Sequence, residues 1–129
     1  MPNSFDYALV RVVPYVEREE FINVGVILFC RTQRFLAARI ELDLQRLAAL
    51  APQCNGQAIQ THLELIPRIC EGAGPIGRLS QAERFHWLVA PRSTIIQTSP
   101  VHSGLCDDPA TALERLVETI GQVDHSPNE

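Results

Sequence analysis

A stretch of twenty residues at positions 90–109, APRSTIIQTSPVHSGLCDDP, contains an arginine, several hydroxyls, a histidine, a cysteine and two aspartates. Arg92, Ser99 and His102 suit the binding of a phosphate or carboxylate, because guanidinium, hydroxyl and imidazole groups donate hydrogen bonds to anions. The alternative is an exposed strand face, on which hydroxyls alternate with Ile95 and Ile96. If Arg92 binds a ligand, Arg92→Ala should leave stability nearly intact and abolish that binding.

Cys106, His102 and either Asp107 or Asp108 form a second candidate, a nucleophile with a base and an orienting acid. A cysteine becomes a thiolate at neutral pH beside a cation or a helix N-terminus, and Cys106 precedes an expected helix. However, His102 is four positions away on an expected loop, and Asp108 is expected to cap the helix. The anion-binding interpretation is therefore preferred to this triad.

Acidic residues gather in a third candidate, the turn VEREE. Glu17, Glu19 and Glu20 are hard oxygen ligands of the kind that bind Mg²⁺ or Mn²⁺. A solvated turn explains them more simply, so we predict no metal site and no cofactor. Asn23 is less easily explained, because it lies in an apolar strand and a buried amide needs hydrogen-bond partners. The neighbouring Gly25 indicates a bulge or a close backbone approach.

Hydrophobic patterning predicts three strands at the start of the chain, at residues 5–13, 21–30 and 34–42. β-Branched and aromatic residues dominate the first two, and the connections are short enough for an antiparallel meander. Strict alternation in the second strand places Ile22, Val24, Val26 and Leu28 on one face and Phe21, Ile27 and Phe29 on the other. This strand is therefore expected at the centre of the sheet, with both faces covered.

Apolar residues recur at helical spacing after Asp43, an expected N-cap, and again in residues 55–71, so a helix is expected in each segment. A capping box, Ser80 to Glu83, starts a short helix that is expected to place Trp87 in the core. Residues 92–99 are expected to form a fourth strand, and Asp108 to cap a last helix that begins at Pro109. The chain is predicted to be one α+β domain, residues 1–129. It has an antiparallel sheet of about four strands, helices packed on one face, and a frayed tail at 122–129.

Composition narrows the classes of function. The net charge of −4 argues against a large basic surface for nucleic acid. Nucleic-acid binding would need Arg11, Arg34, Arg39 and Arg92 on one face of the sheet. The sequence has no run of about 20 apolar residues and no secretory pattern at its start, so a cytoplasmic protein without membrane segments is expected. Its four cysteines are widely spaced and expected to be free thiols.

Two blocks of the sequence carry a family resemblance. YALVRVVPYVEREEFINVGVILFC and FHWLVAPRSTIIQTSPVHSGLCDDP, with the leucine-rich helix that follows, resemble the bacterial family called domain of unknown function 3037. The resemblance covers nearly the whole chain and implies no catalytic residues. It implies one partner, a kinase similar to the HipA toxin kinase, because such kinases are encoded beside members of the family.

The sequence therefore favours a small interaction or regulatory module, with an exposed sheet edge available for strand addition. Self-association into a homo-oligomer stays open. The alternative is a hydrolase or phosphoryl-handling enzyme that uses Arg92 and His102, and nucleic-acid binding is a second, less favoured alternative. The enzyme hypothesis requires Arg92, His102, Asn23 and one of the glutamates to converge on one pocket of a few hundred Å³.

Overall fold

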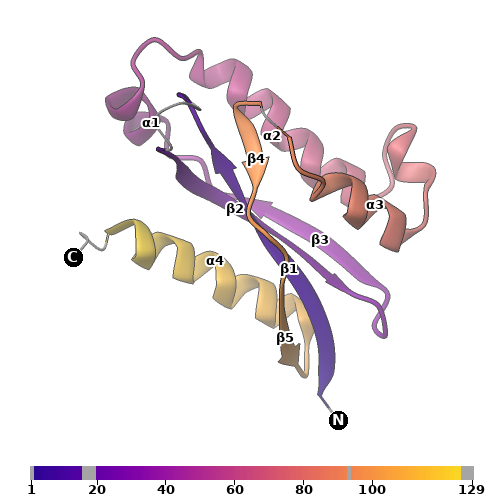
Figure 1. Ribbon diagram of the computed structural model, residues 1–129. Coiled ribbons are helices and arrows are strands. Elements are labelled where there is room, and N and C mark those ends of the chain that lie inside the picture. Colours follow the sequence, from indigo (N-terminus) through magenta and orange to yellow (C-terminus); the bar gives the residue numbers. More distant parts are fainter. Residues whose placement is uncertain (1, 16–19, 93, 126–129) are drawn as a thin grey trace.

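A five-stranded antiparallel sheet forms the centre of the computed structural model, which describes residues 2–15, 20–92 and 94–125 (Figure 1). The strands are β1 (Asn3–Val12), β2 (Ile22–Cys30), β3 (Phe35–Ile40), β4 (Ile96–Thr98) and β5 (His102–Cys106). Their order is β3-β2-β1-β4, and β5 also pairs with β1. The predicted meander and the α+β class are confirmed.

The meander forms because β1, β2 and β3 are consecutive and apolar. β2 lies between β1 and β3, and all its residues except Asn23 are buried. The register between β1 and β2 shifts between Val10 and Arg11, opposite Gly25, as expected of a bulge at this glycine. The extra residue shifts the alternation by one position. The predicted division of β2 was therefore wrong beyond Gly25, where Ile27 and Phe29 join Ile22 and Val24 on one face.

β4 and β5 follow one another along the outer edge of β1 (Figure 1). β4 pairs with Val10–Val12, whereas β5 pairs with Asn3–Tyr7. The strand predicted over residues 92–99 is thus reduced to three residues, and part of the following predicted loop is a strand. Arg92 lies before β4 and outside the sheet, and its side chain bonds to the end of the preceding helix.

Three helices lie between β3 and β4: α1 (Leu44–Leu50), α2 (Gly56–Cys70) and α3 (Gln81–Leu88), with a short 3₁₀ helix, η2 (Ile76–Arg78), before α3. The backbone N–H of Arg46 donates to the Asp43 carboxylate at 3.1 Å, which confirms the predicted cap. Ser80 and Glu83 form the predicted capping box. Gly72, with φ of 101°, takes a left-handed conformation just beyond α2.

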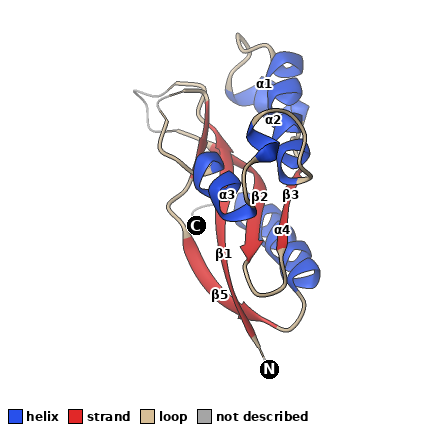
Figure 2. Ribbon diagram, turned by 90° about the vertical axis from the view of Figure 1, so that its right-hand side faces the viewer, coloured by secondary structure: helices blue, strands red, loops and turns tan. Residues whose placement is uncertain are grey.

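The last helix, α4 (Pro109–His125), corrects the expectation that all helices cover one face. Figures 1 and 2 show α2 and α3 on one side of the sheet and α4 on the other. Leu47, Leu63 and Phe85 pack with the first face of β2, whereas Leu113 and Ile120 of α4 pack with Val26, Leu28 and Cys30. Both faces of β2 are apolar, so burial of only one would leave the other in water.

α4 begins at Pro109 as predicted, after Asp108, and continues to His125. It therefore includes the first four residues of the segment predicted to fray, 122–129. None of the helices formed by the described residues is long and apolar enough to cross a membrane.

Candidate functional site

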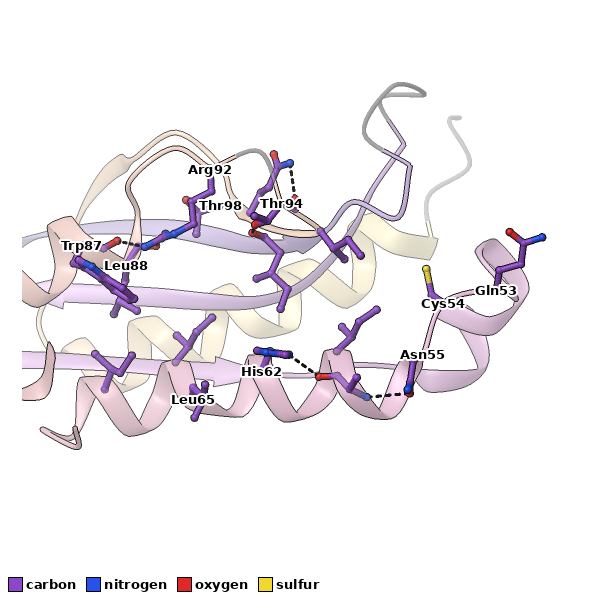
Figure 3. Close-up of a pocket in the computed structure, with 17 residues that line it drawn as sticks. Gln53, Cys54, Asn55, His62, Leu65, Trp87, Leu88, Arg92, Thr94 and Thr98 are labelled. Atoms are coloured by element: carbon purple, nitrogen blue, oxygen red, sulfur yellow. Dashed lines mark hydrogen bonds between the residues drawn. The ribbon is translucent and has the colours of Figure 1, made fainter. Parts of the chain in front are cut away.

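A groove with a volume of about 840 Å³ lies between α2 and the segment that leads into β4. Figure 3 shows Trp87 and Arg92 at one end and Cys54 and Asn55 at the other. One wall is α2, and the other is formed by residues 94–98 with the end of α3. Its lining residues are Gln53, Cys54, Asn55, Ala58, Ile59, His62, Leu65, Ile66, Ile69, Trp87, Leu88, Arg92, Thr94, Ile95, Ile96, Gln97 and Thr98.

The groove exists because α2 and β4 lie apart on the same side of the molecule. Ile59 and Leu63 of α2 are buried in the core, which leaves Ala58, His62 and Leu65 along the edge of the helix that faces away from it. β4 is only three residues long, so the segment around it covers little of that side. Leu65, Trp87 and Ile95 are 46%, 42% and 41% exposed, and all three line the groove.

Trp87 therefore does not anchor the core, contrary to the sequence-based prediction. The core aromatic of α3 is Phe85, which is 2% exposed and stacks on Phe29 with ring centroids 5.5 Å apart. Two positions separate Phe85 from Trp87, and on a helix such residues face different directions. Trp87 instead faces the groove, under the Arg92 guanidinium at 4.6 Å from the ring centroid.

The Arg92 side chain caps the C-terminal end of α3. Its guanidinium donates to the carbonyl oxygens of Trp87 at 2.7 Å, Leu88 at 3.1 Å and Ala90 at 3.2 Å. The last carbonyls of a helix lack partners within it, and a cation there also complements the helix dipole. The arginine singled out for anion binding thus has a structural role that the sequence does not reveal.

Other polar side chains of the groove are also bonded to the backbone of this chain. The Thr94 hydroxyl donates to the Ile96 carbonyl at 2.9 Å, and the Gln97 amide donates to the Thr94 carbonyl at 2.8 Å. The Thr98 hydroxyl donates to the Val89 carbonyl at 3.3 Å, and His62 Nδ1 lies 3.0 Å from the Ala58 carbonyl. These groups are occupied, so what the groove offers to a ligand is mainly apolar surface.

Ser99, another anion-binding candidate, is 4% exposed and joins β1 to the segment after β4. Its hydroxyl accepts from the Leu9 N–H at 2.9 Å and donates to the Pro100 carbonyl at 2.9 Å. Both bonds are internal, so Ser99 contributes to the fold.

Asn23 and His102 do come together, but on the face covered by α4. They line a small hollow of about 130 Å³ with Tyr7, Leu9, Leu116, Thr119 and Ile120. Asn23 Oδ1 is buried and has no hydrogen-bond partner among the residues that the structure describes. The His102 ring lies against that of Tyr7, with 5.4 Å between the ring centroids. Arg92 lines the groove on the opposite face, so the structure does not bring Arg92 and His102 into one pocket.

The remaining candidates do not assemble a catalytic or metal site within the described residues. Glu17 and Glu19 lie outside those residues, and Glu20 is exposed. No group of three or more potential metal ligands was found among the residues described.

Cys106 and His102 stand at opposite ends of β5, about 13 Å apart along the strand at 3.3 Å per residue. Burial, reinforced by the proximity of Cys30 and of two aspartates, raises the pKa of the Cys106 thiol. Asp108 caps α4 by accepting from the Thr111 N–H at 3.3 Å and from its hydroxyl at 2.6 Å. A nucleophilic triad is not formed.

The four arginines considered for nucleic acid do not all lie on one face, and Arg34 is in the turn between β2 and β3. Arg39 pairs with Glu41 of the segment after β3 and with Glu114 of α4, and Arg11 lies over the Phe21 ring at 4.0 Å. Arg92 is on the side of α2 and α3. Together they do not form a basic surface.

Sequence reasoning missed the groove itself. Its walls come from α2, from the end of α3 and from residues 94–98, and only the fold brings these together. One signal was available in the adjacent pair Ile95 and Ile96, since consecutive apolar residues in a strand point to opposite faces and both faces then need cover.

The comparisons with known proteins identify a family. The model of the family described as "Protein of unknown function (DUF3037)" matches residues 7–120 of the 129-residue chain, and the chain therefore belongs to it. No curated protein and no solved structure matched the chain.

Proposed function

We propose that this member of the DUF3037 family is an interaction module that binds an apolar segment of a partner protein in the groove beside α2. One observation carries the proposal: four of the polar side chains that line the groove bond to the chain's own backbone, whereas Leu65, Trp87 and Ile95 are exposed. Apolar patches of this kind mark interaction sites, and aromatic residues are enriched at the centres of interfaces.

The hydrolase or phosphoryl-handling alternative has less support. Its two main residues, Arg92 and His102, line separate cavities on opposite faces of the sheet. Three of the guanidinium hydrogen bonds of Arg92 go to carbonyls of the same chain. A general base or an anion-binding group must lie within hydrogen-bond reach of the same substrate as its partner.

The partner is proposed to be another cytoplasmic protein. A kinase of the HipA type, which the family resemblance implies, is the first candidate to test. A second copy of this chain is the competing occupant of the groove.

The experiment compares capture of partners by the wild-type chain with capture by two groove variants, Leu65→Glu and Ile95→Glu, and one control, Leu105→Glu. Leu105 is 71% exposed on β5, and β5 contributes no residue to the groove. We expect one protein to be recovered at near-equal amount with the wild type and the control. Its recovery should fall about tenfold or more with either groove variant, because a charge there replaces a central apolar contact.

A partner that is lost equally with Leu105→Glu, or that binds Leu65→Glu as well as the wild type, would show that the groove is not the interface. Analytical ultracentrifugation of the purified chain distinguishes the homo-oligomer. Dimerisation that Leu65→Glu abolishes would assign the groove to a second copy instead of a different protein.

A further inference from the structure

The dimensions of the groove follow α2. Its lining residues on this helix run from Asn55, the N-cap, to Ile69, near the end. At 1.5 Å per residue this is about 21 Å, the length of about four turns of an α-helix.

The groove edge formed by the β4 segment is poorly suited to an added strand. The Ile95 carbonyl accepts from the Val13 N–H and so points to the side of this segment that pairs with β1. The carbonyls of Thr94 and Ile96 accept from side chains of the same segment, those of Gln97 and Thr94. Strand addition depends on available main-chain groups at the edge, and the Thr94 and Ile96 carbonyls, which alternate with that of Ile95 and point to the open side, are already bonded. A helix forms its own backbone hydrogen bonds, so a helix fits this groove better than an added strand.

The opposite face of the sheet shows how a helix is bound in this fold. α4 places Leu113 and Ile120 against Val26 and Leu28, with partly buried Leu116 and Val117 beside them. On the groove side α3 is only eight residues long, and the space past Trp87 lies beside α2 without a helix among the described residues (Figure 3).

The charges around the groove indicate which end of a bound segment lies near Arg92. The net charge of the chain is −4, yet no carboxylate is among the described residues that line the groove, and Arg92 stands at one end. Within the described part of the chain, no ion pair is formed by Arg92, so its charge is stabilised by carbonyl dipoles and the Trp87 ring and by no carboxylate. A carboxylate at that end of the ligand would complement it.

We infer that the partner segment is an amphipathic α-helix of about four turns that lies beside α2, with apolar residues at i, i+3 or i+4, and i+7 and a carboxylate near Arg92. This inference rests on the proposed function, because it names the chemistry of the segment that the groove binds.

The test selects ligands from a displayed library of 16-residue peptides against the wild-type chain, with depletion against Leu65→Glu. We expect enriched sequences to share apolar residues at helical spacing and an Asp or Glu at one end. Trp87 is the only tryptophan of the chain, so an enriched peptide should shift its emission to shorter wavelength, and the peptide should become helical by circular dichroism on binding.

Substitution within the peptide then tests the carboxylate while Arg92 and the fold of the protein stay intact. A Glu→Gln peptide should bind about two- to fivefold more weakly, as expected for a solvent-accessible ion pair. A Glu→Lys peptide should bind more weakly still, and a Glu→Gln change at a solvent-facing position of the same peptide should have no effect.

The outcomes separate the two hypotheses. Enriched peptides that bind extended, or that lack the acidic residue, contradict the helix while leaving the groove as an interface. If selection yields no sequence that distinguishes the wild type from Leu65→Glu, both the helix and the proposed function are wrong.

Discussion

At the scale of single residues, Arg92 contributes more to the fold than its sequence context suggests. Its three hydrogen bonds to the end of α3 and its position over Trp87 are lost in Arg92→Ala. We expect the free energy of unfolding to fall by about 1–2 kcal/mol, since the bonds are charge-assisted but solvent-accessible. Urea denaturation followed by circular dichroism measures this. Arg115→Ala, an exposed arginine of α4, is the matched control and should be neutral.

This expectation reverses the one drawn from the sequence, in which Arg92→Ala leaves stability nearly intact. If the variant is as stable as the wild type, the helix-capping role is wrong, and ligand binding again becomes the better explanation of this arginine.

The opposite effect is expected at Asn23, because its buried Oδ1 has no hydrogen-bond partner in the described part of the chain. Asn23→Val removes an unsatisfied acceptor from a strand, so stability should stay equal or rise by about 1 kcal/mol. Asn3→Val is the contrasting variant, since Asn3 Oδ1 accepts from the Thr32 hydroxyl at 2.9 Å and that bond would be lost. A clear loss of stability in Asn23→Val, measured by urea denaturation, would mean that the amide has a partner in solution.

At the scale of elements, Gly25 explains how β2 fits between its neighbours. A Cβ at this position would lie 2.5 Å from the Arg39 carbonyl oxygen and 2.7 Å from Ile40 Cδ1. Gly25→Ala must push β3 away from β2 and should cost about 1–3 kcal/mol. In Gly56→Ala the nearest atom is the end of the Leu44 side chain at 2.9 Å, which can move, so the cost should be smaller. Thermal unfolding of the two variants checks the order.

The start of α4 predicts a dependence on pH. The Thr111 hydroxyl donates to Asp108 and lowers the pKa of that carboxyl below its ordinary value of 3.8. The ionised form therefore stabilises the folded chain above that value, and this contribution is lost as the pH falls through the lowered pKa. Asp108→Ala should unfold at a lower temperature than the wild type at pH 7, and the difference should shrink at pH 3.

Asp108→Asn separates capping from charge in the same measurement. Asparagine also caps helices, so this variant should keep most of the stability at pH 7 and show less change with pH. Equal unfolding temperatures of the wild type and Asp108→Ala at pH 7 would exclude a capping contribution.

The elements that sequence predicts well are those set by neighbouring residues. The meander, the caps at Asp43 and Ser80 and the start of α4 follow from local patterns and are found in the structure. β5 was missed because Ser103 and Gly104 have low strand propensity. Its pairing is with β1, and Ser103 bonds to Asp6 across 97 residues of sequence. Such contacts leave no periodic signal.

At the scale of the whole molecule, the same limit applies to the groove and to the placement of α4. An amphipathic pattern shows that α4 must bury one side, but the pattern does not show which face of the sheet receives it. The sequence of β2 contains part of this information, because both faces of the strand are apolar and both must be covered. The groove depends on where α3 ends and on how far β4 extends. The Arg92 side chain caps the end of α3 through local hydrogen bonds, whereas the extent of β4 depends on its long-range pairing with β1.

The two layers of helices share β2, and this predicts that the chain unfolds as one unit. Leu63 of α2 is fully buried on one face and Leu113 of α4 is 4% exposed on the other. Leu63→Ala and Leu113→Ala should each lower the free energy of unfolding by about 2–5 kcal/mol. Trp87 is on the side of α2, and its fluorescence reports unfolding there. Because the adjacent residues Val26 and Ile27 of β2 pack on opposite faces, loss of one layer should unfold the other. In Leu113→Ala the urea midpoint from Trp87 fluorescence should therefore shift as much as the midpoint from circular dichroism. If Leu113→Ala moves the circular dichroism transition and leaves that of Trp87 in place, α4 and the groove side are separate folding units.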